Sequence, residues 1–202
     1  MMAMGEPQVT WKQPGFNGWR ALSSGMADIY HYTDTSRLPW IIQSGELRPG
    51  SNAIGGFPKP DFLWATSDPQ GDRTASANRG EHWRTGRLWH ARFVFDSADF
   101  VRWTDSRDSL PGWTTDHVRL LEATKDAEPA AWWYRTEPIS IDECLGLEFR
   151  SYTSKSWRNL GVTRPTEMEN GSLFIMVDDK KPFCSARQAM PAYGGAYAYQ
   201  VL

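Results

Sequence analysis

The sequence predicts an α+β domain built on a mostly antiparallel sheet with few helices. Several short runs alternate apolar with polar residues and are bounded by Gly, Pro, Asp or Ser, as half-buried strands are. One segment near the N-terminal end combines helical apolar spacing with a glycine stop. Strands that follow one another through turns pair most readily as antiparallel neighbours.

The first strand is expected over residues 28–33, with the sequence Asp-Ile-Tyr-His-Tyr-Thr. An amphipathic helix follows, with Leu38, Ile41 and Ile42 on its apolar face. Pro39 is compatible with the first turn of that helix, where amide groups have no intrahelical partner. Gly45 is expected to end the helix in the left-handed conformation.

The later elements are predicted from the same alternation and from turn residues. In a strand over 88–96, the apolar side chains from Trp89 to Phe95 occupy one face, and His90 and Arg92 occupy the other. The remaining expected strands cover 62–67, 133–140, 145–151 and 172–178, and the remaining helices cover 72–82 and 118–131.

Length and composition indicate one globular domain with an appendage. The chain has 202 residues, of which 40% are hydrophobic and 23% charged, and this is enough to bury a core. We expect an N-terminal lead-in over 1–27, a core over 28–151, and a C-terminal appendage over 152–202 packed on the core.

Charge and segment composition narrow the class of protein. A formal net charge of −2 argues against a strongly basic, non-specific nucleic-acid binder. Cys144 and Cys184 form no metal-ligand spacing, so no metal is expected. The N-terminus lacks the basic end and apolar run of a secretion signal, and no stretch reaches the length of a membrane span. We therefore expect a soluble, cytoplasmic protein that has no membrane partner.

Polar and aromatic side chains gather on the strands on either side of the first helix. The first strand carries His31, Tyr32 and Thr33, and the second carries Trp64 and Ser67. Imidazole and hydroxyl groups can hydrogen-bond a ribose, and an indole can stack on a flat base. Cleavage of the nicotinamide bond of NAD would further need a carboxylate near the developing positive charge. These residue types together indicate a nucleotide site.

The order of these motifs resembles the start of ADP-ribosyltransferase domains. The matching segments are residues 30–33 (Tyr-His-Tyr-Thr), 44–48 (Ser-Gly-Glu-Leu-Arg) and 63–67 (Leu-Trp-Ala-Thr-Ser). The pattern is similar in particular to DNA-modifying toxins of the DarT type and to RNA 2′-phosphotransferases. It covers roughly Asp28 to Arg150.

The resemblance implies an ADP-ribosyltransferase-like split sheet that binds NAD as substrate. It implies that His31 contacts the NAD ribose and that Tyr32 or Ser67 helps to seat the nicotinamide ribose. The implied function is mono-ADP-ribosylation of a macromolecule, either a nucleic acid or a protein, as in a toxin or defence effector. An antitoxin or inhibitor would be a further partner.

The sequence departs from the family pattern at the catalytic carboxylate. Such transferases place a glutamate late in the core, shortly before a Pro-Ile or Pro-Leu pair. Here Glu137 precedes Pro138, but it falls later than the pattern expects, and Trp132 and Trp133 stand earlier. Glu148 is the second candidate. If neither points into the cleft, we expect the fold to bind NAD or a related nucleotide without rapid turnover.

Arginines around the expected helix over 72–82 suggest a contact with phosphate. Arg73 and Arg79 are spaced to share one helical face, where they would hold a pyrophosphate or a nucleic-acid backbone. The alternative is an ordinary solvated helix face.

Two further functions compete with ADP-ribosyl transfer. One is 2′-phosphate transfer from RNA onto NAD, although the chain lacks the clear spacing of basic residues that this family uses. The other is a catalytically idle module that binds NAD or another nucleotide, or a protein partner.

Overall fold

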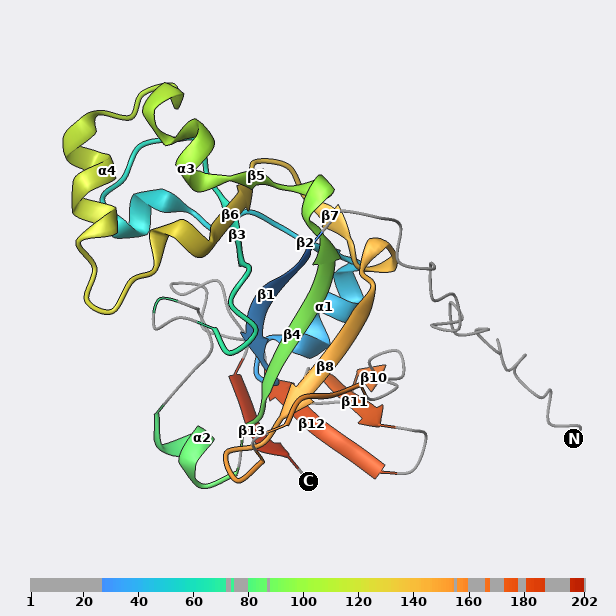
Figure 1. Ribbon diagram of the computed structural model, residues 1–202. Helices are drawn as coiled ribbons and strands as arrows, with labels where there is room; N and C mark the ends of the chain where they lie inside the picture. Colours follow the sequence, from blue (N-terminus) through green and yellow to red (C-terminus); the bar gives the residue numbers. More distant parts are fainter. Residues whose placement is uncertain are drawn as a thin grey trace, which may run out of the picture.

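The computed structural model describes residues 27–71, 74, 80–86, 88–154 and 156–159, together with the backbone of four later strands between 166 and 201. Within these ranges the protein has a seven-stranded sheet, a four-stranded sheet and a two-stranded ribbon, accompanied by short helices (Figure 1). All strand pairs in the two larger sheets are antiparallel. The predicted α+β class with a mostly antiparallel sheet and few helices is confirmed.

The seven-stranded sheet forms the centre of the molecule, in the order β5-β6-β3-β1-β4-β8-β9. Its strands are β1 (Asp28–Asp34), β3 (Leu63–Thr66), β4 (His90–Asp96), β5 (Val101–Arg102), β6 (Trp132–Arg135), β8 (Gly146–Arg150) and β9 (Arg158–Asn159). The ribbon pairs β2 (Glu46–Leu47) with β7 (Ile139–Ser140). The four-stranded sheet contains β10 (Thr166–Glu167), β11 (Leu173–Val177), β12 (Lys181–Arg187) and β13 (Tyr197–Val201).

The helices are short, and none of those described is long and apolar enough to cross a membrane. The α-helices are α1 (Leu38–Ser44), α2 (Glu81–Arg84), α3 (Trp103–Ser106) and α4 (Thr115–Glu122). Single 3₁₀ turns are η1 (Asn52–Gly55), η2 (Ser97–Asp99), η3 (Arg107–Ser109), η4 (Pro129–Ala131) and η5 (Ile141–Glu143). As predicted, α1 ends at Gly45, whose φ of 73° is left-handed.

Three expected elements differ from those observed. The helix expected over 118–131 begins earlier, at Thr115, because the side chain of Thr114 caps it by accepting from the backbone amide of His117, and it ends at Glu122. The strand expected over 133–140 is two strands in different sheets, β6 and β7, with Pro138 between them. The helix expected over 72–82 falls mostly outside the described residues, and the described part, α2, begins at Glu81.

The large sheet has a separate apolar core on each face. One core includes Ala65, Phe93 and Leu147, together with Leu38 of α1. The other contains aromatic residues of β3 and β6 and of the segment with α3 and α4. Because side chains alternate along a strand, Leu63 and Ala65 belong to the first core and Trp64 to the second. We name these the α1 face and the aromatic face.

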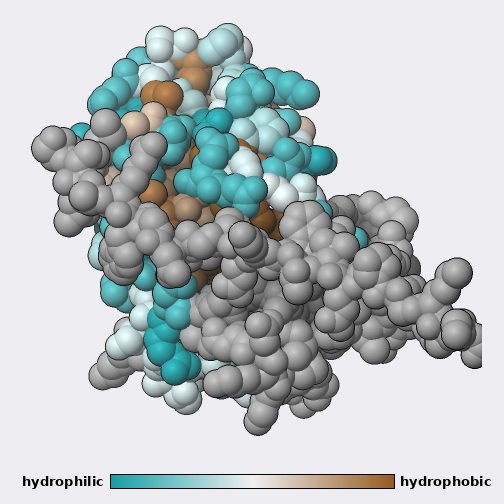
Figure 2. Space-filling model, turned by 90° about the vertical axis from the view of Figure 1, so that its right-hand side faces the viewer, coloured by the Kyte–Doolittle hydropathy of each residue, from teal (hydrophilic) through white to brown (hydrophobic). Residues whose placement is uncertain are grey.

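The segment with α3 and α4 lies at one end of the sheet and α2 at the other (Figure 1). Figure 2 shows one side of the molecule, where hydrophobic residues emerge between hydrophilic ones toward the upper end, the height at which Figure 1 draws α3 and α4. The aromatic core beneath that segment is made mainly of Phe62, Trp103, Trp132 and Tyr134, all 6% exposed or less.

Candidate functional site

His31 lies where the two halves of the large sheet meet. Between β1 and β3, the described strands share one residue pair, Tyr30 with Thr66, whereas β1 and β4 are paired along their whole length. Just beyond that pair, Nδ1 of His31 lies 2.7 Å from the carbonyl oxygen of Trp64. This side-chain hydrogen bond thus joins β1 to β3, which share one backbone pair in the described strands.

The Trp64 carbonyl fixes the protonation of the imidazole. A carbonyl oxygen only accepts, so Nδ1 carries the proton. Burial lowers the pKa of His31, the Trp64 carbonyl opposes this shift and the charge of Arg37 adds to it. At neutral pH the ring is therefore uncharged, and Nε2 is a hydrogen-bond acceptor that has no protein partner in the part of the chain that the structure describes.

A tryptophan of β6 lies on the same face of the sheet as His31. His31 pairs with Phe93 of β4, whose side chain belongs to the α1-face core. On the other side of β1, Ala65 of β3 pairs with Trp133 of β6, and both pack on the same core. Because paired residues point to the same face, His31 and Trp133 both lie on the α1 face, on the strands that flank β3.

The other candidate binding residues are distributed over both faces. Thr33 is on the α1 face with His31 but is only 2% exposed. Trp64 packs edge-on against Phe62 and Trp132 on the aromatic face. Ser67 is exposed at the end of β3, and its backbone amide donates to the Ala131 carbonyl at 2.9 Å. Around the β1–β3 junction, His31 is thus half-buried and Ser67 is exposed.

Tyr32 belongs to a polar cluster on the aromatic face. Its hydroxyl donates to the carbonyl oxygen of Asp68 at 2.9 Å and accepts from Nη1 of Arg92 at 3.2 Å. Burial raises the pKa of Tyr32 to about 12, so the hydroxyl keeps its proton at physiological pH. Arg92 is itself only 7% exposed, and its guanidinium carbon lies 4.1 Å from the ring centre of Tyr30 and 4.4 Å from that of Trp157.

The two candidate carboxylates lie apart from His31. Glu148 pairs in register with Arg92 and therefore points to the aromatic face, where Nη2 of Arg92 is 2.6 Å from its Oε2. Glu137 is exposed in the turn between β6 and β7, and its backbone carbonyl accepts from Arg135. Glu148 thus lies on the face opposite to His31, and Glu137 lies outside the paired strands.

Arg92 lies at the centre of the polar cluster with Tyr32 and Glu148, but the sequence did not indicate it as a site residue. The alternation of β4 assigns it to the face opposite Phe93, as observed, but does not show that Tyr32 and Glu148 lie across from it. That information is in the register of β1 and β8 with β4. Arg73 lies outside the described residues, as does Arg79.

The described residues include no group of three or more His, Cys, Asp and Glu side chains arranged to hold a metal ion. The half-buried Cys144 has a pKa raised to about 11, mainly by burial, so its thiol is protonated at neutral pH.

Comparison of the whole chain with models of known families, with curated proteins and with solved structures finds no significant match.

Proposed function

We propose that this protein binds a nucleotide of the NAD class at the junction of β1 and β3 and does not transfer its ADP-ribose. The observation that carries the proposal is that His31 of β1 and Trp133 of β6 lie on the same face of the sheet, on the strands that flank β3. Together they offer an acceptor suited to a ribose hydroxyl and a tryptophan on β6, where catalysis would need a carboxylate.

The binding half of the proposal rests on His31 and Ser67. The neutral imidazole presents Nε2 as an acceptor, and a ribose hydroxyl is a matching donor. Ser67 adds a hydroxyl at the exposed end of β3, where it lies 3.4 Å from the Ala131 carbonyl. Both residues belong to the motifs that resemble ADP-ribosyltransferases.

The second half of the proposal, that ADP-ribose is not transferred, rests on the need for a negative charge beside the ribose. Departure of nicotinamide leaves positive charge on the ribose, and an enzyme stabilises it with a fixed anion. Trp133 carries no charge and cannot act as a general base. Glu148 is engaged by Arg92 on the opposite face, and Glu137 lies in an exposed turn. Transfer by Glu137 or Glu148 onto a nucleic-acid or protein acceptor is the competing hypothesis.

Calorimetric titration with NAD, combined with a nicotinamide-release assay on the same preparation, tests the proposal. We expect saturable binding without release. His31→Asn should weaken binding about tenfold, because the amide NH2 of asparagine can still donate to the Trp64 carbonyl from the position of Nδ1, while the shorter side chain places no acceptor where Nε2 lies. His82→Asn, at an exposed histidine of α2, is the matched control.

Nicotinamide release that Glu137→Gln or Glu148→Gln abolishes would contradict the proposal and support the transferase. Wild-type protein that does not bind NAD would contradict the binding half.

A further inference from the structure

The short loop that follows β3 is anchored by side chains of the sheet. We name residues 68–71 the post-β3 loop. The hydroxyl of Tyr32 donates to the carbonyl oxygen of Asp68 at 2.9 Å, and Nη1 of Arg92 donates to the carbonyl oxygen of Pro69. Two consecutive carbonyls of the loop are therefore held from β1 and β4.

The second half of the loop is held in the same way. Nη1 of Arg150 donates to Oε1 of Gln70 at 2.8 Å. Gly71 lies against the ring of Tyr32 so closely that a Cβ there would be 3.1 Å from Cζ, and its φ of 75° is left-handed. Each residue of the loop thus contacts a side chain from β1, β4 or β8.

These contacts occur where backbone pairing with β1 is sparse. In the described strands, β1 and β3 share only the pair of Tyr30 with Thr66, the last residue of β3, and the backbone amide of Ser67 then donates to the Ala131 carbonyl. The loop that follows has its own turn, in which Gln70 and Gly71 donate to the side chain and carbonyl of Asp68. That turn gives the loop its shape, and the side chains of β1, β4 and β8 hold it against the sheet.

We propose that Tyr32 and Arg92 are positioning residues, which hold the post-β3 loop, directly after Ser67, in place for the nucleotide. This inference rests on the function proposed above. Tyr32 is 5% exposed, so it acts through the Asp68 carbonyl and not by touching a ligand. Its role therefore differs from the direct contact with the nicotinamide ribose that the family resemblance implies.

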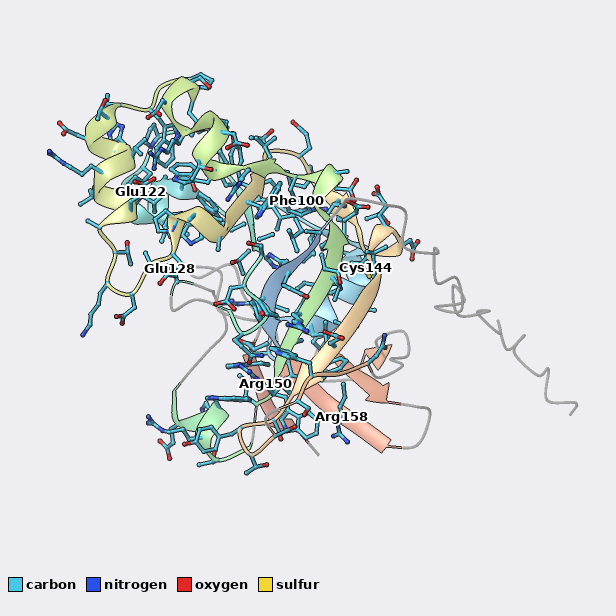
Figure 3. The ribbon with its side chains drawn as sticks, in the orientation of Figure 1. Phe100, Glu122, Glu128, Cys144, Arg150 and Arg158 are labelled. Carbon is cyan, nitrogen blue, oxygen red and sulfur yellow. The ribbon has the colours of Figure 1, made fainter. Side chains whose placement is uncertain are left out.

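Tyr32→Phe is the sharpest variant, because it keeps the ring that packs on Gly71 and removes only the hydroxyl. Amide hydrogen exchange at Gln70 and Gly71 should accelerate about tenfold, and the affinity for NAD should fall about fivefold. Exchange in α4 should not change. Figure 3 shows Glu122 of α4 at the upper left of the molecule, away from Arg150 in its lower half.

Two further variants complete the test. Gly71→Ala strains the backbone of the loop itself. It should also accelerate amide exchange in the loop and lower the affinity for NAD. Arg119→Gln removes an exposed ion pair with Asp116 on α4 and should produce neither.

The outcomes separate this inference from the proposed function. Unchanged exchange at Gln70 and Gly71 in Tyr32→Phe would overturn the anchoring of the loop. Faster exchange with unchanged NAD affinity would overturn the positioning role. If the wild-type protein fails to bind NAD, the proposed function fails, while the exchange data still decide whether Tyr32 anchors the loop.

Discussion

Arg92 and Glu148 form an ion pair across β4 and β8, with Nη2 2.6 Å from Oε2 and side chains 8% and 25% exposed. The same guanidinium lies over the rings of Tyr30 and Trp157 and donates to the Pro69 carbonyl. Glu148 supplies the charge that balances a nearly buried cation. Glu148 therefore has a structural role, although it is one of the two carboxylates that the sequence indicates as catalytic candidates.

Glu148→Gln should therefore lower the free energy of unfolding. Breaking a fully buried ion pair costs about 3–5 kcal/mol, and the partial exposure of Glu148 reduces the expected loss to about 2 kcal/mol. Urea denaturation at neutral pH measures it. Glu137→Gln, in an exposed turn, is the control and should change the value by less than about 0.5 kcal/mol. Equal effects of the two substitutions would contradict the role assigned to Glu148.

His31 should make folding stability depend on pH. Its pKa is lowered in the folded protein, so the unfolded chain binds a proton first as the pH falls. The contribution of His31 to the free energy of unfolding is therefore complete above the ordinary histidine pKa of about 6.5. It decreases as the pH falls below that value.

Comparing the free energy of unfolding at pH 7.5 and pH 5 tests this expectation. The wild-type protein should lose more stability than His31→Gln over this interval, since glutamine does not titrate. Identical losses in the two proteins would show that His31 titrates alike in the folded and unfolded states.

Gly45→Ala should destabilise the protein by about 1 kcal/mol, because a φ of 73° is unfavourable for a residue with a Cβ. No atom lies within 4 Å of the new Cβ, so the cost comes from the backbone alone. Gly50→Ala is the matched control, because its new Cβ also has no atom within 4 Å and its φ is not left-handed. Thermal melts should show a lower Tm for the first variant than for the second.

Local signals in the sequence were sufficient for the first strand and helix. Two signals extend over only a few residues: the alternation of apolar and polar side chains around Phe93, and the glycine at position 45 that ends a helix. Such signals were enough to predict β1, α1 and the two faces of β4. The strand expected over 133–140 failed because its two halves choose different partners, β3 for Trp133 and β2 for Ile139. Such choices depend on segments far away along the chain.

The candidate site was limited by the same lack of long-range information. His31 could be selected because polar and aromatic residues surround it on the first strand, and Glu148 because it carries a carboxylate. That they point to opposite faces follows from the register of β4 with its two neighbours, which no local pattern encodes. The placement of His31 and Trp133 on strands that flank β3 likewise depends on the order β6-β3-β1.

A crystal structure of the protein soaked with NAD tests the central claim most directly. We predict an intact dinucleotide at the β1–β3 junction, with a ribose hydroxyl within hydrogen-bond distance of Nε2 of His31 and no carboxylate at the anomeric carbon. Density for ADP-ribose without nicotinamide, with Glu137 or Glu148 beside that carbon, would contradict the account, as would NAD bound away from His31.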